Sequence, residues 1–160
     1  MISTIEQLVI QLGETLKKQQ LKIVTAESCT GGGLAYWMTN VPKSSEWFER
    51  GFVTYSNLAK EELLGVRSDT LLQFGAVSQE VAAEMAEGAL RYSEANVSVA
   101  ITGIAGPDGG TEEKPVGTVW IACTKIQRKT KTTKNIFSGN RQAIREQSMR
   151  AALEMLLAFI

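Results

Sequence analysis

The stretch that decides the fold is residues 21–33, which read LKIVTAESCTGGG. Residues 21–26 form a short apolar segment with the β-branched Ile23 and Val24 at its centre, and this pattern predicts a strand. Glu27 and Ser28 follow at once, and three consecutive glycines then lead into residues 34–39, which predict a helix. The stretch is therefore a strand, a glycine-rich turn and a helix in immediate succession.

Elements of these two kinds alternate along the rest of the chain. Further helices are predicted over residues 2–19 with Ser3 or Thr4 as N-cap, from Asn57 as N-cap through residue 64, around 69–74, over 79–93 after the cap Ser78, and over 140–160. Strands are predicted over residues 52–56 and 96–102, and an antiparallel pair over 116–124 and 129–137. Helices interleaved with apolar strands predict an α/β fold, a three-layer α/β/α sandwich on a mixed sheet.

Length and composition are those of an ordinary folded domain. The chain has 160 residues, 44% hydrophobic and 21% charged, without an internal repeat or a linker, so residues 1–160 are expected to form one domain. No stretch approaches the ~20 apolar residues of a transmembrane helix, and no signal-peptide pattern begins the chain. The two cysteines, Cys29 and Cys123, cannot build a disulfide framework, which favours the reducing cytoplasm as the compartment.

The chain contains no histidine. This absence excludes Ser-His and Cys-His nucleophilic pairs as well as histidine metal ligands. The two cysteines lie too far apart in the sequence for a zinc-ligand spacing, so no metal site is predicted. If the chain is an enzyme, its base is a lysine, a carboxylate, a tyrosine or water.

The net charge of zero hides an asymmetry. Residues 1–118 hold nine basic and fifteen acidic side chains, whereas residues 119–160 hold eight basic and two acidic ones. Four of the basic residues fall on the last predicted strand, namely Arg128, Lys129, Lys131 and Lys134. We interpret them as charge that keeps an edge strand from pairing with other chains. A nucleic-acid surface is the alternative, but single-strand binding would favour interleaved aromatic residues, which this segment lacks.

Ser28 is the first candidate for chemistry. It follows a predicted strand and precedes a glycine-rich helix start, where backbone N–H groups are unpaired and the helix dipole is positive. Such a position suits an anion or a developing oxyanion, held by the turn that contains Thr30, Gly31 and Gly32. Alternatively, Ser28 or Thr30 is only an N-cap. Cys29 is a rival nucleophile, because a helix N-terminus lowers a thiol pKa, or else it is a small buried hydrophobe.

Tyr55 and Lys60 are the second pair of candidates. If Tyr55 ends a strand and Lys60 lies in the first turn of the next helix, both enter a cleft at the carboxyl edge of the sheet, where open α/β sheets bind ligands. To act as a base near pH 7, Lys60 needs a pKa about 3 units below its usual ~10.4. The alternative is an exposed lysine beside Glu61 and Glu62.

A long loop provides a third candidate. Residues 103–115 hold four glycines and two prolines without periodic pattern, and loops of this length in a compact domain are often functional. Thr102, Gly103, Ala105 and Gly106, at its start, would let backbone amides approach a ligand closely. The run matches neither a Walker motif nor G-x-G-x-x-G, so an ordinary long turn is the alternative.

Arg141 and Arg145 are the fourth candidate. They lie four residues apart near the start of the last predicted helix, and therefore on one face of it. Two guanidinium groups beside free helix N–H groups would make a phosphate site. The alternative is a pair of solvated arginines.

Five ordered runs resemble the C-terminal domain family of the competence/damage-inducible protein CinA. The runs are TAESCTGG at residues 25–32, GFVTYSN at 51–57, GAVS at 75–78, GIAGPDGG at 103–110 and KPVGTVW at 114–120. They extend over nearly the whole chain. The resemblance implies hydrolysis of the carboxamide of nicotinamide mononucleotide to nicotinate mononucleotide and ammonia, within pyridine-nucleotide salvage.

The resemblance also implies a serine nucleophile, a lysine partner and a nearby tyrosine, which fall on Ser28, Lys60 and Tyr55. In the mechanism that we expect, neutral Lys60 takes the proton of Ser28, directly or through Tyr55, as the hydroxyl attacks the amide. The N–H groups from Cys29 through Gly31 would hold the oxyanion. Neither a metal nor a cofactor is needed.

Two other functions stay open at this point. A non-catalytic nucleotide-binding or regulatory module would use the same glycine-rich loops without a nucleophile. A DNA-associated protein is suggested by the basic C-terminal third of the chain, and its DNA binding would weaken steeply with salt. The partner expected first is the small-molecule substrate, without membrane or nucleic acid, and a homo-oligomer is compatible with the sequence.

Overall fold

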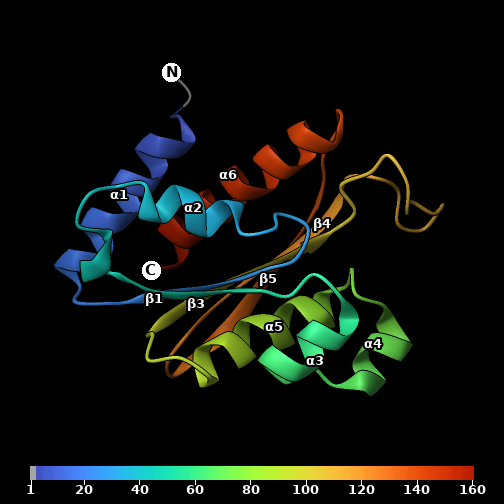
Figure 1. The fold of residues 1–160 in the computed structure, drawn as a ribbon, viewed down its shortest axis with the longest axis horizontal. Coiled ribbons are helices and arrows are strands. Elements are labelled where there is room, and N and C mark those ends of the chain that lie inside the picture. The colour runs from blue at the N-terminus through green and yellow to red at the C-terminus, as the bar shows by residue number, and fades with distance from the viewer. Residues whose placement is uncertain (1–2) are drawn as a thin grey trace.

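A computed structural model describes residues 3–160 of the chain, which fold into a five-stranded sheet between two layers of helices (Figure 1). The elements follow one another as α1 (Ile5–Lys18), β1 (Ile23–Glu27), α2 (Gly33–Thr39), a short 3-10 helix (Ser44–Glu46), β2 (Phe48–Val53), α3 (Asn57–Leu64), α4 (Ser68–Phe74), α5 (Gln79–Arg91), β3 (Val97–Gly103), β4 (Thr118–Lys125), β5 (Arg128–Ile136) and α6 (Arg141–Phe159). The 3-10 helix lies in a segment for which no helix or strand was predicted.

The sheet is mixed, as the sequence predicted. Its strand order is β2-β1-β3-β4-β5, in which β1 pairs in parallel with β2 and β3. The pairs β3–β4 and β4–β5 are antiparallel. The carboxyl ends of β1, β2 and β3 therefore meet at one edge of the sheet, where parallel α/β sheets place their ligands.

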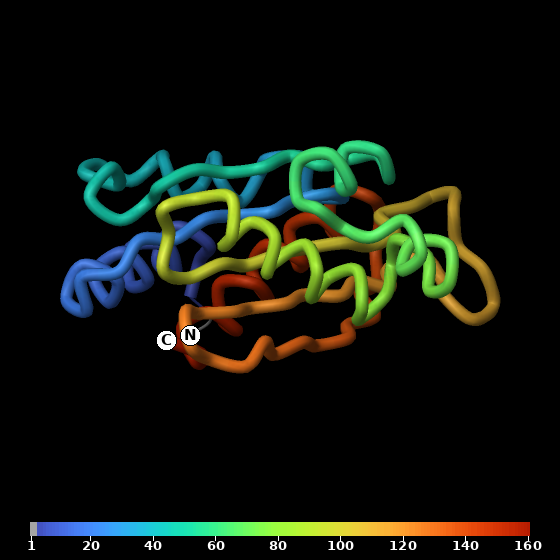
Figure 2. Tube along the Cα trace, turned by 90° about the horizontal axis from the view of Figure 1, so that it is seen from below, coloured from blue at the N-terminus to red at the C-terminus, as the bar shows by residue number. Residues whose placement is uncertain are grey.

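Each face of the sheet has its own hydrophobic core. Helices α1, α2 and α6 cover one face and α3, α4 and α5 cover the other (Figure 1), and the tube trace shows the sheet from the side of α3, α4 and α5 (Figure 2). Neighbouring strand residues point to opposite faces, so Ile23 packs in the first core and Val24 in the second. The predicted three-layer α/β/α sandwich is confirmed.

The second strand begins and ends earlier than the sequence predicted. Residues 52–56 were the expected strand, but β2 pairs with β1 over Phe48–Val53, and the backbone N–H of Thr54 makes the last bond, to the Glu27 carbonyl. The helix cap is Ser56 rather than Asn57, because the Ser56 hydroxyl accepts from the Ala59 N–H. Tyr55 consequently lies beyond the sheet, in the connection to α3.

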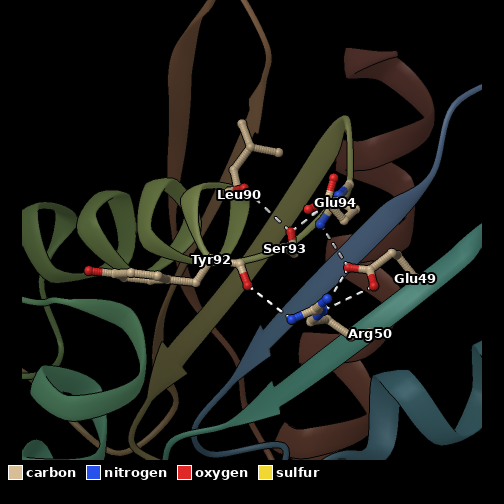
Figure 3. A network of polar contacts seen from close by, with 7 residues as sticks. Glu49, Arg50, Leu90, Tyr92, Ser93 and Glu94 are labelled. Atoms are coloured by element: carbon tan, nitrogen blue, oxygen red, sulfur yellow. Dashed lines mark hydrogen bonds and ion pairs between the residues drawn. The ribbon is translucent and has the colours of Figure 1, made fainter.

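A polar network holds the opposite end of the sheet (Figure 3). The Arg50 guanidinium on β2 contacts the Glu49 carboxylate at 2.7 Å and donates to the Tyr92 carbonyl. The same carboxylate accepts from the backbone N–H of Glu94. These contacts fix β2 to the connection between α5 and β3, at the end away from Ser28.

Two surface predictions have structural outcomes. The basic strand β5, with Arg128, Lys129, Lys131 and Lys134, is an edge strand, as expected. None of the helices described within residues 3–160 combines the length and the apolar character that a bilayer-crossing helix needs.

Candidate active site

A cavity of about 210 Å³ opens at the edge of the sheet where the parallel strands end. Its walls come from the turn after β1, the segment between β2 and α3, the turn before α5, the end of β3 and the start of α6. The lining residues are Ser28, Cys29, Tyr55, Asn57, Lys60, Ala76, Val77, Thr102, Gly103, Ala105 and Arg141. The structure thus brings together residues from all four sequence candidates.

Ser28 and Lys60 are in direct contact. Lys60 Nζ lies 3.0 Å from Ser28 Oγ, and both side chains are buried, with Lys60 only 1% exposed. Within residues 3–160, no carboxylate lies within ion-pair distance of Lys60. Burial without a compensating negative charge lowers the pKa of Lys60 below the usual lysine value, so the interpretation of Lys60 as an exposed residue beside Glu61 and Glu62 is wrong.

Lys60 Nζ has three hydrogen-bond partners. Besides Ser28 Oγ, Nζ donates to the carbonyls of Thr54 at 3.0 Å and Tyr55 at 3.1 Å. A neutral amine has two N–H bonds and one lone pair. In the neutral form, with both N–H bonds directed to these carbonyls, the lone pair would face Ser28 Oγ and could accept the hydroxyl proton.

Local structure explains how Lys60 arrives there. The Ser56 cap starts α3 right after the chain leaves β2, so Lys60 lies in the first turns of that helix. Lys60 and Leu64 are the two buried residues of α3 and lie one turn apart on its inner face. The helix therefore delivers one long, otherwise apolar side chain toward the carboxyl end of β1.

Glu27 organises the turn that carries Ser28. Its carboxylate is buried and accepts from the Thr30 hydroxyl at 2.6 Å and from the backbone N–H groups of Leu34 at 2.8 Å and Ala35 at 3.0 Å. The positive end of α2 is therefore occupied by a side chain of the protein, which corrects the expectation that it is open to a substrate anion. Sequence reasoning missed Glu27, although a carboxylate that ends an apolar strand was a visible signal.

Two backbone N–H groups of this turn remain available. Within the part of the chain that the structure describes, the N–H groups of Cys29 and Thr30 donate to no backbone or side-chain oxygen. The Gly31 N–H donates to the Ser28 carbonyl at 3.0 Å, so Gly31 is not a free donor as expected, and Gly32 caps α2 with a φ of 96°. These two N–H groups are the unpaired donors of the turn that an oxyanion could use.

Cys29 does not have the environment of a nucleophilic thiol. Its side chain is 5% exposed and packs in the core on the α1 face of the sheet. Burial raises the pKa of the Cys29 thiol to about 11, against the expectation that the helix terminus lowers it. The alternative reading of Cys29 as a small buried hydrophobe fits the structure.

Tyr55 contributes its backbone to the base and its side chain to the mouth of the cavity. Its carbonyl accepts from Lys60, as described, whereas its ring is 62% exposed. The Tyr55 hydroxyl accepts from Arg141 Nη2 at 3.1 Å. The hydroxyl therefore does not stand between Lys60 and Ser28, which corrects the idea of a proton path through Tyr55.

The start of the long loop forms the far wall. The Thr102 hydroxyl is buried and donates to the Ala76 carbonyl at 2.8 Å, which joins the end of β3 to the turn before α5. A Cβ at Gly103 would come within 2.6 Å of Val119 Cγ2 and 2.9 Å of the Thr118 carbonyl, so close packing requires glycine there. The Gly106 carbonyl accepts from Arg141 Nη1 at 2.7 Å.

The structure separates the two arginines that the sequence placed together. Arg141 lines the cavity and spans its mouth between Gly106 and Tyr55. Arg145 lies behind the Ser28 turn, where Nε donates to the Cys29 carbonyl at 3.0 Å and Nη2 to the Thr30 carbonyl at 3.1 Å. Only Arg141 is in position to contact a ligand in the cavity.

Another hollow within residues 3–160 lies at the other end of the sheet and lacks this combination. This hollow, of about 490 Å³, has carboxylates, Arg91 and Ser93 in its lining, but no buried base beside the hydroxyl. Within residues 3–160, no three cysteine or carboxylate side chains come together as metal ligands would. Asn57, Ala76 and Val77 also line the site, although none of them was predicted to be a site residue.

The chain is similar to known proteins over nearly its whole length. Over 154 residues the chain is 53% identical to the nicotinamide-nucleotide amidohydrolase PncC of Escherichia coli, which covers 96% of this chain and 93% of that protein. The protein of the same name from Pseudomonas putida is 50% identical over 150 residues, covering 94% and 93%. The crystal structure of a competence/damage inducible protein from Agrobacterium tumefaciens superposes with a TM-score of 0.95 at 44% identity, over 99% of this chain and 98% of that one.

The family model for the CinA C-terminal domain matches residues 5–160, which is nearly all of the chain. That range contains all five runs on which the resemblance in the sequence rested, among them the Ser28 turn and the start of the long loop, and it also contains Lys60. The chain therefore belongs to the family of the CinA C-terminal domain.

Proposed function

We propose that this chain hydrolyses the carboxamide of nicotinamide mononucleotide to nicotinate mononucleotide and ammonia, as part of pyridine-nucleotide salvage in the cytoplasm. The observation that carries the proposal is the buried Lys60 amine, 3.0 Å from the Ser28 hydroxyl and without a carboxylate partner in residues 3–160. The names of the relatives, nicotinamide-nucleotide amidohydrolases at about half identity, supply the substrate. A non-catalytic binding module would have no use for this pair.

The first half of the reaction forms an acyl-enzyme. Neutral Lys60 accepts the proton of Ser28 as Oγ attacks the carbon of the carboxamide. The carbonyl oxygen becomes an oxyanion, which the N–H groups of Cys29 and Thr30 hold. The Lys60 ammonium then gives its proton to the amide nitrogen, the C–N bond breaks, and ammonia leaves.

The second half returns the enzyme to its starting state. A water molecule gives a proton to Lys60 and attacks the ester that joins the nicotinoyl group to Ser28. The same two N–H groups hold the second oxyanion. Collapse of this intermediate breaks the bond to Oγ, which takes the proton back from Lys60, and nicotinate mononucleotide is released.

Ammonia release from three substrates tests the proposal. The purified protein is expected to release ammonia from nicotinamide mononucleotide much faster than from nicotinamide riboside or nicotinamide, since only the nucleotide carries the phosphate. The product is identified as nicotinate mononucleotide by chromatography. Binding of the nucleotide without any ammonia would instead support a non-catalytic nucleotide-binding module, and the proposal would be wrong.

Arg141 is the expected contact for the substrate phosphate. It lies at the mouth of the cavity and uses two of its five N–H donors on Gly106 and Tyr55, which leaves others for an anion. Arg141→Ala should lower kcat/KM for the nucleotide roughly 10- to 100-fold, the value of one charge-assisted hydrogen bond.

The same variant should lower kcat/KM for the riboside much less, because the riboside has no phosphate to lose. The measurement is the ratio of kcat/KM for the two substrates, in the wild-type protein and in Arg141→Ala. If the variant keeps the full preference for the nucleotide, the phosphate is bound elsewhere, and the loop at residues 102–110 is the next place to test.

A further inference from the structure

Arg145 gives its hydrogen bonds to the backbone of the turn that holds Ser28. Its Nε and Nη2 atoms donate to the carbonyls of Cys29 and Thr30, and its guanidinium packs against Gly31, where an added Cβ would lie 3.3 Å from Nη2. No carboxylate forms an ion pair with Arg145 in the described part of the chain. The charge is therefore directed at peptide groups of the turn.

These peptide groups are the ones that supply the free donors. The Cys29 carbonyl and the Thr30 N–H belong to one peptide unit, and the Ser28 carbonyl and the Cys29 N–H belong to the unit before it. In the first unit the carbonyl accepts from Arg145, and in the other it accepts from the Gly31 N–H. A donor on the carbonyl side of a peptide fixes its plane and makes its N–H a stronger donor.

We propose that Arg145 is a positioning residue of the oxyanion site: its guanidinium holds and polarises the peptide unit whose N–H, on Thr30, binds the oxyanion. This inference rests on the proposed amidase function. It replaces the phosphate contact that the sequence suggested for Arg145. A cation behind the turn stabilises negative charge that appears in front of it, in the transition state and not in the bound amide.

The turn is held from its other side by Glu27. That carboxylate binds the Thr30 hydroxyl and the first N–H groups of α2, so Thr30 has its side chain fixed by Glu27 and its carbonyl by Arg145. With both contacts in place, the orientation of the Thr30 N–H is fixed. Loss of Arg145 releases the turn on the side of α6 only, which leaves the α2 cap intact.

Steady-state kinetics of Arg145→Ala test the role. Loss of an oxyanion donor costs about 10²- to 10³-fold in kcat, and because Arg145 acts through the peptide, the expected loss in kcat is smaller, roughly 10- to 100-fold. KM for the nucleotide should change less than about threefold, and the preference for nucleotide over riboside should stay that of the wild type. Arg145→Lys, which keeps the charge but reaches one carbonyl at a time, should recover part of kcat.

Arg150→Ala is the matched control, since Arg150 lies on the same helix and contacts the Ser3 carbonyl, far from the site. Its kcat should equal that of the wild type. A raised KM with unchanged kcat in Arg145→Ala, together with a lost preference for the nucleotide, would show that Arg145 binds phosphate and overturn the inference. Unchanged kinetics would overturn it too. A wild-type protein that releases no ammonia would instead contradict the proposed function itself.

Discussion

Ser28→Ala should abolish ammonia release from nicotinamide mononucleotide. Loss of the nucleophile in an acyl-transfer enzyme removes the covalent route altogether, so the expected fall in kcat is on the order of 10⁴-fold or more. Binding of the nucleotide should persist, because Ser28 supplies the attacking atom while Arg141 and the turn supply the contacts. The measurements are ammonia release and calorimetric titration with the nucleotide, with circular dichroism to verify the fold.

Cys29→Ala is the companion variant that decides between the two nucleophiles. The thiol is buried with a pKa of about 11, so at neutral pH it is protonated and carries no nucleophilic thiolate. Its removal leaves the backbone N–H of residue 29 in place, and most of the activity should remain. The reverse result, an active Ser28→Ala enzyme and an inactive Cys29→Ala enzyme, would transfer the chemistry to the thiol.

The position of Ser28 could be predicted because it depends on local rules. An apolar β-branched segment forms a strand, glycines with positive φ permit the turn, and parallel strands bring such turns to one edge of the sheet. The same rules placed Arg141 and Arg145 on one face of α6, four residues apart. What lies opposite that face is set by tertiary packing: Arg145 meets carbonyls 116 and 115 residues away in the sequence, and Arg141 meets one 35 residues away.

The orientations of Lys60, Tyr55 and Glu27 depend on tertiary packing and could not be predicted from the sequence. Spacing alone favoured an exposed Lys60, because Glu61 and Glu62 follow it, and only the packing of α3 shows that Lys60 points inward while its neighbours do not. The end of β2 at Val53 moved Tyr55 out of the strand, so that its carbonyl rather than its hydroxyl meets Lys60. The role of Glu27 was not predicted, because a residue at the end of a strand was not expected to accept hydrogen bonds from the start of the following helix.

Lys60 is expected to be as necessary as Ser28. Lys60→Met removes the base while roughly keeping the volume, and Lys60→Arg keeps a positive charge that cannot be released, since guanidinium stays protonated in proteins. Both variants should lose about 10³-fold or more in kcat. General acid–base catalysis typically contributes about 10²- to 10⁴-fold. Lys129→Met, an exposed lysine on β5, is the control and should keep full activity. An active Lys60→Arg enzyme would show that another group is the base.

The pH dependence follows from the direction of the Lys60 pKa shift. Burial lowers the pKa in the folded protein below the ~10.4 of an unfolded lysine, so kcat/KM should rise with pH as Lys60 loses its proton, with an apparent pKa below ~10.4. The unfolded chain binds this proton more tightly than the folded one. The burial of Lys60 therefore lowers the free energy of unfolding. This destabilisation is complete at pH values below the folded pKa of Lys60, and it disappears as the pH rises toward ~10.4.

Lys60→Met has no such proton, so the stability of the wild type relative to this variant should increase with pH across that window, whatever the two differ by at neutral pH. Urea unfolding of both proteins at pH 7 and near pH 10 measures the change directly, because all other titrating groups are common to the pair. A difference that stays constant with pH would mean that Lys60 titrates like an exposed lysine. The amine would then be charged at neutral pH and unable to take the proton of Ser28, and the activity would need a different base.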